Sequence, residues 1–472
     1  MIKDKFKSRL EPKAGKIGIL IETKEDVKEE DKLNVWQLTL IGVGGIIGAG
    51  FFLATSIAIQ HTGPAVLINY LLGGFIMSQV FAALAEMSVA NPVSGSFRVY
   101  AEEALGRQAG FMSGWMYWIA GVLVMSSEVT ASAIFTSYWI PQLPLWITTF
   151  IYSLLIIGVN SLGVKEFGTI ESWFSIFKLS ALIAFIILAA LVLLGILPGG
   201  PGGLQYYTQY GGFLPHGFRG LLASSLMVLL SFGGVEVTAM AASQTIEPSE
   251  TVPKAIRNIV TILLTLYLGS IALILAITPW NHITTKASPF VTIFGFIHIP
   301  YGGSVMNFVI LTAALSTMNA AMYAVTQVLF SLGKGDFAPS IFEKKSKNGV
   351  AIYALAASSL GLGLAVVLAY LLPETVYEYI TSAAGFVLFF NWIIILLTHI
   401  RYRPILEKKF SKELRFKMWG YPYTSWITIF LIGGVLLSTL LSAREMVGFF
   451  GGVLIILLLL ASYSFAKKLK LL

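Results

Sequence analysis

Residues 41–52 read IGVGGIIGAGFF, an apolar stretch in which five of the nine residues from 42 to 50 are glycine. Each glycine lowers helix propensity by about 1 kcal/mol relative to alanine. Small residues at helical spacing also let two membrane helices pack closely, but that alternative explains a single pair of small residues better than so dense a cluster. The stretch therefore predicts a membrane helix that is interrupted in its middle.

Five spans later, residues 229–236 read LLSFGGVE and form a second candidate interruption. Interrupted helices at matching places in two halves of a membrane protein indicate a transporter whose site lies near the bilayer midplane. An unwound helix exposes unpaired N–H groups on one side and unpaired carbonyls on the other, and each costs several kcal/mol in lipid unless it finds a partner. A zwitterion can satisfy both kinds of group, so the two interruptions predict a site for an amino acid.

The chain as a whole has the composition of an integral membrane protein. Of its 472 residues, 56% are hydrophobic and only 12% are charged, so a soluble fold would expose large apolar patches to water. Apolar stretches of about 20 residues, long enough to cross a bilayer as helices, recur from residue 35 onward. We predict twelve membrane-spanning helices, near residues 36–59, 65–89, 110–136, 143–160, 172–196, 220–242, 256–278, 303–330, 350–371, 377–399, 424–442 and 446–466.

Lysine and arginine residues lie almost entirely in alternate loops. They follow the even-numbered spans, with the densest run from Arg401 to Lys417, whereas the other loops carry only Arg219, Lys286 and Arg444. Because positively charged loops remain in the cytoplasm, both termini are expected there, in the cytoplasmic membrane of a bacterium. This distribution explains the net charge of +8 without nucleic-acid binding.

The same features divide the chain into four parts. Residues 1–34 mix lysines with acidic residues and lack the apolar core of a signal peptide, which predicts a cytoplasmic tail. We expect a ten-helix inverted-repeat transport core over 35–400, a basic cytoplasmic loop over 401–422, and two accessory membrane helices with a short cytoplasmic tail over 423–472. The sequence contains no cysteine, which excludes disulfides and cysteine catalysis within it.

Further motifs follow one another in a specific order. The sequence has PVSGS at 92–96 with Tyr100, GWMYW at 114–118, NSLGVKEFG at 160–168, and Glu247-Pro248 followed by VPKAI at 252–256. Together with residues 42–52, these motifs make the chain resemble, over about residues 33–440, the bacterial amino acid permeases of the amino acid–polyamine–organocation (APC) superfamily, in its amino acid transporter family. The resemblance implies an all-α membrane protein with a five-plus-five inverted repeat, broken helices one and six, and two extra helices.

The resemblance also implies that the substrate site is formed by eight residues at the two interruptions, namely Ile46, Gly48, Ala49, Gly50, Leu230, Ser231, Phe232 and Gly233. The main-chain N–H groups of residues 48–50 would bind the substrate carboxylate. The carbonyls of residues 46, 230 and 233 would bind its amino group, and residues 231 and 232 would line the site. Two positions depart from the family pattern: Ser96 stands where a second glycine is common, and Gln327 where span eight usually has an arginine.

Two ionisable residues within the spans are candidates for proton coupling or gating. Lys178 lies about two turns into span five, where it either extends to the cytoplasmic surface or, as in relatives that it resembles, lies against spans one and eight in place of a sodium ion. Glu236 follows the second interruption, where an acid takes part in gating in related carriers; a purely structural glutamate is the alternative.

The remaining polar groups are less specific. Glu128 in span three is consistent with a preference for cationic substrates, with a structural role or with a proton-linked role. The five histidines are scattered at span ends and in loops, so we expect no metal site and no cofactor. No nucleophile or acid pair within the spans suggests an enzyme.

The sequence thus predicts a secondary active amino acid transporter that couples uptake to protons by alternating access. The expected partners are an amino acid, a proton and membrane lipid. An amino acid exchanger on the same scaffold is the nearest alternative, and a transporter-like nutrient receptor is an alternative from another class.

Overall fold

The computed structural model describes residues 32–93, 96–162, 164–197, 202–241, 245–284, 287–297, 299–346, 349–409 and 414–469. Within these residues the chain is helical and forms no β-strand; a single isolated pairing joins Leu33 to Thr245. The predicted N-terminal tail lies outside the described residues as far as residue 31. Ser94, Gly95 and Gly163 in the family motifs also lie outside them.

The first two spans are built from several helical pieces. The first consists of α2 (Val35–Ile46), α3 (Ala49–Phe52) and α4 (Ala54–Thr62), and a short turn, η3 (Gly63–Ala65), leads into the second span, α5 (Val66–Ala90). Helix α2 begins with a capping box, because Asn34 accepts the N–H of Gln37 and Gln37 accepts the N–H of Asn34. The predicted interruption is present between α2 and α3.

The first half of the bundle continues with α6 (Ser96–Leu105), a helix outside the spans, and with the third to fifth spans, α7 (Arg107–Thr136), α8 (Leu145–Leu162) and α9 (Val164–Leu193). The second half begins with the sixth span, which is again in pieces: α10 (Gly217–Ala223), α11 (Ser225–Leu230) and α12 (Val235–Ala241). Each half therefore starts with an interrupted helix.

The remaining elements complete the second half and add two spans. They are α13 (Pro248–Ile277), the short α14 (Pro289–Phe296), α15 (Gly302–Lys334), α16 (Ile352–Leu371), α17 (Val376–Lys409), α18 (Tyr423–Ser438) and α19 (Glu445–Lys468). Helix α17 continues ten residues past 399, into the segment expected as a basic loop, because Tyr402 and Leu406 are buried on its inner side. Short 3₁₀ turns lie at Leu204–Tyr207, Trp280–His282, Ser340–Glu343 and Thr439–Leu441.

Eleven stretches of the described chain are long and apolar enough to cross a membrane, and Val35–Ile46 is a shorter apolar helix. The first stretch, Ala49–Ala90, contains the turn η3 and therefore holds the end of span one and all of span two. Divided there, the described residues contain the twelve predicted crossings. The all-α membrane fold with two interrupted helices is confirmed.

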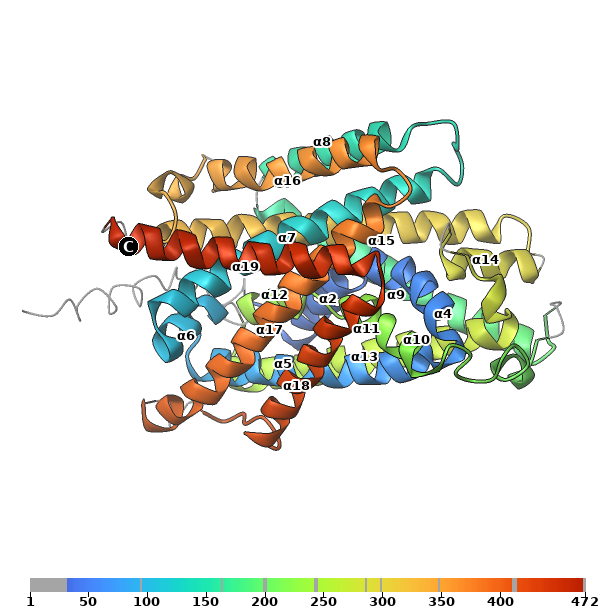
Figure 1. Cartoon of the computed structure of the whole chain (residues 1–472), viewed down its shortest axis with the longest axis horizontal. Helices are drawn as coiled ribbons and strands as arrows, with labels where there is room; N and C mark the ends of the chain where they lie inside the picture. The colour runs from blue at the N-terminus through green and yellow to red at the C-terminus, as the bar shows by residue number, and fades with distance from the viewer. Residues whose placement is uncertain are drawn as a thin grey trace, which may run out of the picture.

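The interrupted helices lie in the middle of the bundle (Figure 1). Helices α2 and α12 pack against each other, with α7 and α15 on one side and α5 and α13 on the other. Helices α8 and α16 form an outer layer next to α7, and α17, α18 and α19 cross the face turned toward the viewer. The binding elements are thus shielded from lipid by uninterrupted helices.

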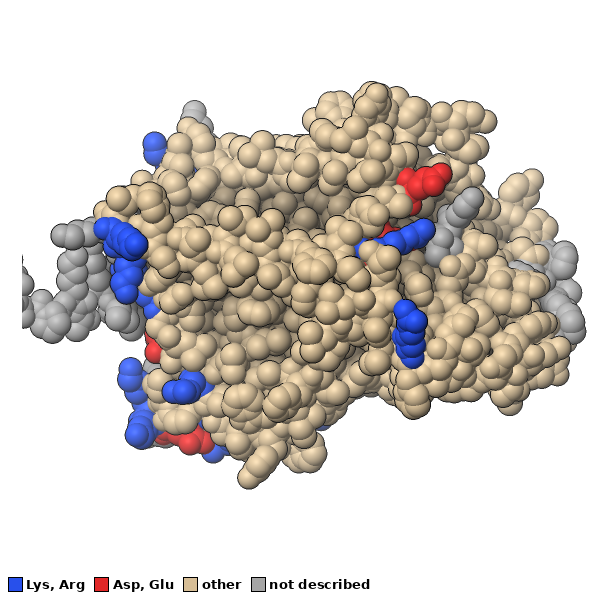
Figure 2. Space-filling model, viewed as in Figure 1, with Lys and Arg blue, Asp and Glu red and all other residues tan. Residues whose placement is uncertain are grey.

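The two ends of the bundle differ in charge. Figure 2 shows most of the visible lysine and arginine side chains at the end where α6 and the C-terminus lie, which we call the basic end. The opposite end carries α14 and has few charged residues on this face; we call it the α14 end. The surface between the two ends carries few charged side chains on this face, as expected of the part of a membrane protein that lies in the bilayer.

The contact between α19 and α17 allows a test of the packing. A Cβ added at Gly448 on α19 would lie 2.6 Å from the carbonyl carbon of Ser382 and 2.8 Å from the nitrogen of Ala383, whereas a Cβ at Gly451 would meet nothing within 4 Å. Gly448→Ala should therefore cost about 1–3 kcal/mol by overpacking and lower the melting temperature of the purified protein. Gly451→Ala is the control and should leave it unchanged or slightly higher; equal melting temperatures for the two variants would contradict this packing.

Candidate functional site

The backbone of span one leaves the helical path at Ile47 and Gly48. Helix α2 ends at Ile46, Ile47 is extended (φ −77°, ψ 100°), Gly48 is extended (φ −140°, ψ −158°), and α3 begins at Ala49. A helix that ends inside a membrane exposes carbonyls that need partners. The residues that supply those partners define the site.

Lys178 on α9 is the partner of two of these carbonyls. Its Nζ donates hydrogen bonds to the carbonyl oxygens of Gly44, at 2.5 Å, and Ile47, at 3.1 Å, and the side chain is completely buried. Thr317 on α15 donates a further hydrogen bond to the carbonyl oxygen of Ile47, at 3.0 Å. The lysine therefore does not extend to the membrane surface, which was one of the two interpretations of the sequence; it lies at the interruption between spans one and eight.

Glu128 on α7 lies on the other side of the same interruption. Its Oε2 accepts the N–H of Ala49 at 2.9 Å, and a Cβ added at Gly48 would lie 2.7 Å from its Oε1. Glu128 is almost fully buried and is close enough to Lys178 for electrostatic attraction. A carboxylate of the protein itself thus occupies one of the N–H groups expected to bind the substrate carboxylate.

The interruption of span six is a tight turn between α11 and α12. The carbonyl of Leu230 accepts the N–H of Gly233 at 3.0 Å, and Gly234 adopts a left-handed conformation with φ 108°. A Cβ at Gly234 would be strained at this φ and would also lie 2.9 Å from the carbonyl oxygen of Gly45. Glycine is required here because the two interruptions approach each other at backbone distance.

A direct hydrogen bond links the interruptions. The hydroxyl of Ser231 donates to the carbonyl of Gly50 at 2.8 Å, and the hydroxyl of Tyr267 on α13 donates to the carbonyl of Ser231 at 2.9 Å. Tyr377 on α17 donates to the carbonyl of Ala49 at 3.3 Å. Backbone groups next to the two breaks are thus contacted by side chains from several uninterrupted helices.

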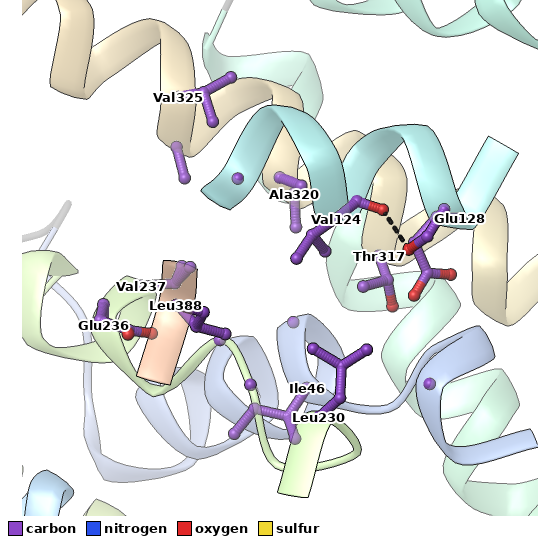
Figure 3. A pocket seen from close by; sticks show the side chains of 18 of the residues that line it. Ile46, Val124, Glu128, Leu230, Glu236, Val237, Thr317, Ala320, Val325 and Leu388 are labelled. Carbon is purple, nitrogen blue, oxygen red and sulfur yellow. Dashed lines mark hydrogen bonds between the residues drawn. The ribbon is translucent and has the colours of Figure 1, made fainter. Parts of the chain in front are cut away.

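A cavity lies between the interruptions and the α7–α15 pair (Figure 3). Of the eight residues expected to bind substrate, four line it: Ile46, Gly50, Leu230 and Gly233. Glu128 and Thr317 line the cavity beside Gly50, and Glu236 lines it farther along. The cavity lining does not include the other four expected binding residues or the lysine, namely Gly48, Ala49, Ser231, Phe232 and Lys178. The first four belong to the interrupted segments themselves, and the lysine bonds to the end of α2.

The α14 end of the site is closed by aromatic rings. Phe51 stacks on Tyr267 with centroids 3.8 Å apart and packs against Phe290 of α14 at 5.1 Å. Phe232 packs against Tyr267 at 5.2 Å and Tyr70 at 5.9 Å. Phe232 therefore belongs to this aromatic plug, formed by Phe51, Tyr70, Phe232, Tyr267 and Phe290, rather than to the cavity wall.

The cavity extends from the interruptions in the other direction. Its lining residues on α7 run from Glu128 back to Tyr117, toward Arg107, and those on α15 run from Thr317 to Val325, toward Lys334. Both series lead to the basic end. The site is thus closed toward the α14 end and hollow toward the basic end.

Near the basic end, Arg98 of α6 holds the end of α15. Its Nε donates to the hydroxyl of Ser331 at 3.3 Å, its Nη1 pairs with Glu102 at 3.2 Å, and its guanidinium lies over the ring of Phe337. Ser331 lies one turn beyond Gln327, where the family pattern has an arginine. In this chain an arginine thus reaches the same helix from the neighbouring α6.

Glu236 lies on the far side of the second interruption, in the first turn of α12. Its Oε1 accepts the indole N–H of Trp392 at 2.5 Å, and its Oε2 has no hydrogen-bond partner among the described residues. The side chain is completely buried. It lines the cavity, and Figure 3 shows it on the opposite side of the labelled lining residues from Glu128.

Comparison with known proteins agrees with this geometry. A family model described as amino acid permease matches residues 37–472. The chain belongs to the amino acid permease family. This permease is 37% identical over 418 residues to the gamma-aminobutyric acid permease of Bacillus subtilis (strain 168), which covers 88% of this chain and 89% of the relative. It is 34% identical over 406 residues to the aromatic amino acid transport protein AroP of Escherichia coli (strain K12), which covers 86% and 89% of the two chains.

The family assignment confirms the resemblance and the expectation of amino acid transport by a multi-pass membrane protein that is not an enzyme. Sequence analysis missed the contributions of Thr317, Tyr377, Tyr267 and Tyr117 to the site. These residues carry no local signal, because a Thr or Tyr within an apolar helix is equally consistent with ordinary packing. Only the three-dimensional arrangement brings them to the interruptions.

Gly50 offers a direct test of the cavity. A Cβ at this position would lie 3.5 Å from the nearest atom, the carbonyl oxygen of Leu230, which is ordinary van der Waals contact. Gly50→Leu should therefore fold, but its side chain should fill the cavity between the interruptions. We expect it to abolish the thermal stabilisation that substrate gives to the purified permease, whereas Gly50→Ala should retain part of it. Unchanged substrate affinity in Gly50→Leu would contradict the assignment.

Proposed function

We propose that this permease is a proton-coupled amino acid symporter that works by alternating access. The observation that carries the proposal is the contact between the two interruptions, where Ser231 bonds to Gly50 beside a buried cavity. Unwound segments that face a cavity near the middle of the membrane are the sites at which secondary transporters hold their substrates. In the proposed complex, carbonyls around Ile46, Leu230 and Gly233 hold the amino group.

We further propose that the basic end faces the cytoplasm of a bacterium. Lysines and arginines gather at that end (Figure 2), and positively charged ends of membrane proteins remain on the cytoplasmic side. Leu33 pairs with Thr245, nine residues before Lys254, and α19 ends at Lys468, so both ends of the described chain lie there. The cavity then extends from the interruptions toward the cytoplasmic side, and the aromatic plug lies on the outer side.

The position of Glu128 supports the proposal of proton coupling. The Ala49 N–H that it occupies belongs to the group of N–H donors proposed for the substrate carboxylate. Two carboxylates that share one small, poorly hydrated site repel each other, so at most one of them remains charged. Protonation of Glu128 would weaken its hydrogen bond to this N–H group, because a neutral carboxyl is a poorer acceptor than a carboxylate, and would remove the repulsion. Arrival of a substrate carboxylate would thereby be coupled to uptake of a proton.

Lys178 has a complementary role in this proposal. Its ammonium holds the carbonyls of Gly44 and Ile47 and attracts Glu128. Neutralisation of Glu128 removes that attraction, so the lysine is the group that transmits the change to the backbone of span one. One proton that moves down a membrane potential of about 100 mV releases about 2.3 kcal/mol, enough for roughly fifty-fold accumulation. We assign Glu236, which is tied to Trp392 of α17, to gating at the second interruption.

Proteoliposomes distinguish symport from the nearest alternative, amino acid exchange. With vesicles that contain no amino acid and an inward proton gradient, we expect the amino acid to accumulate inside above its external concentration. This accumulation should collapse when a protonophore dissipates the gradient. Uptake that requires amino acid inside the vesicles and ignores the gradient would show an exchanger instead. Binding without any uptake would favour a nutrient receptor.

The two buried charges give separate predictions. Lys178→Ala should weaken concentrative uptake much more than substrate binding, because the site loses its coupling cation but keeps its N–H donors. Glu128→Gln should retain an acceptor for the Ala49 N–H but lose its titrating proton, so the remaining transport should no longer respond to the proton gradient.

The control for both variants is Lys254→Ala, which removes a solvent-exposed lysine paired with Glu250 far from the cavity. It should behave as the unaltered protein in binding and uptake. If accumulation and its pH dependence also survive in Lys178→Ala and Glu128→Gln, these residues have no part in coupling.

A further inference from the structure

We infer that the amino acid carried by this permease has an uncharged, apolar side chain. The inference rests on the proposed function of the cavity and concerns its substrate class. It is drawn from the side chains that surround the space left after the amino acid head group is placed at the interruptions.

The head group fixes the direction in which the side chain points. The backbone groups that would hold it lie at one end of the cavity, around Ile46, Gly50 and Leu230. Beyond them the cavity continues between α7, α15 and α17, as Figure 3 shows with Val124, Ala320 and Leu388. An α-amino acid held at the interruptions can place its side chain only in this space.

The walls of that space are apolar. On α7 they are Gly121 and Val124, on α15 Ala320, Ala321, Ala324 and Val325, on α12 Val237, and on α17 Leu388. Burial of each additional methylene group of a substrate against such walls contributes about 0.8 kcal/mol. Gly121 packs closely against Val325, since a Cβ added at the glycine would overlap Cγ1 of the valine. The small side chains that leave width for a substrate side chain are therefore the three alanines of α15.

The polar groups in this part of the cavity are few and partly occupied. The hydroxyl of Ser127 already donates to the carbonyl of Val124 at 2.8 Å. Tyr117 contributes a ring and one hydroxyl. Among the described residues, Glu236 is the one acidic residue of the lining beyond Glu128, and the indole of Trp392 occupies its Oε1.

A cationic side chain is the main competitor, because it could approach Oε2 of Glu236. A lysine ammonium, however, has three N–H donors, and this end of the cavity offers Oε2 of Glu236 and the Tyr117 hydroxyl among otherwise apolar groups. A buried donor without an acceptor is costly. An apolar side chain leaves no donor unsatisfied, so the lining favours it.

Norleucine and lysine test the inference as a matched pair, since both have a four-carbon side chain and lysine differs only by an ammonium group on the terminal carbon. We would measure their binding to the purified full-length permease by competition and by thermal shift, together with leucine, phenylalanine and γ-aminobutyrate. Norleucine, leucine and phenylalanine should bind, and lysine should bind about 100-fold more weakly than norleucine.

The outcomes separate this inference from the proposed function. Lysine or γ-aminobutyrate binding as tightly as norleucine would overturn the apolar class while amino acid transport stands. Absence of binding by every amino acid of a complete panel would overturn the transport proposal itself. Because these measurements use the unaltered protein, they do not depend on the folding of any variant.

Ala324 provides a second measurement. Ala324→Leu should shorten the side-chain space and weaken norleucine binding at least about tenfold relative to alanine binding, and Ala324→Asp should raise the affinity for lysine relative to norleucine. Ala314, on the same helix but outside the cavity lining, supplies the control variant Ala314→Val, which should not change either ratio. Ratios that stay constant in both Ala324 variants would show that the side chain of the substrate lies elsewhere.

Discussion

Every backbone N–H and carbonyl freed inside a membrane must find a partner, because lipid offers none. Two interrupted helices free several such groups at once in this permease, and the surrounding structure is arranged around them. Lys178 and Thr317 hold the carbonyls at the end of α2, Glu128 holds the N–H at the start of α3, and Tyr267 and Tyr377 hold carbonyls beyond the breaks. The uninterrupted helices α7, α9, α13, α15 and α17 are thus all tied to the two breaks.

The signs of these partners match the polarity of a broken helix. The carbonyl end of α2 meets an ammonium and the N–H end of α3 meets a carboxylate, which is the arrangement that backbone dipoles favour. A zwitterionic substrate carries the same two charges. The site therefore contains an internal counterpart of the proposed substrate, and in the proposed cycle binding is an exchange of partners rather than the filling of an unpaired space. This exchange is why a proton is a natural part of the proposed cycle.

The sequence predicted the interruptions and the membrane fold because both are encoded locally, in glycine clusters and in apolar length. It could not decide whether Lys178 reached the surface, since both interpretations place a lysine two turns into a span. The Ala49–Glu128 bond joins residues 79 positions apart, and no local pattern specifies such a contact. Phe232 was expected in the site because it belongs to the glycine-rich segment, yet its ring turns to Tyr70 and Tyr267; side-chain direction at an irregular turn depends on the neighbouring helices.

In the proposed cycle, the aromatic plug lets one pair of interruptions serve both sides of a membrane. Phe51 follows the first break directly and Phe232 lies within the second, so the plug is built from the same segments that would hold the substrate. A backbone shift at Gly48 or Gly234 that accommodates a ligand must therefore also displace plug rings. Phe290 comes instead from α14, which is not part of either interrupted span. The proposed cycle then needs no separate relay between site and gate, because movement of either interrupted span changes both at once.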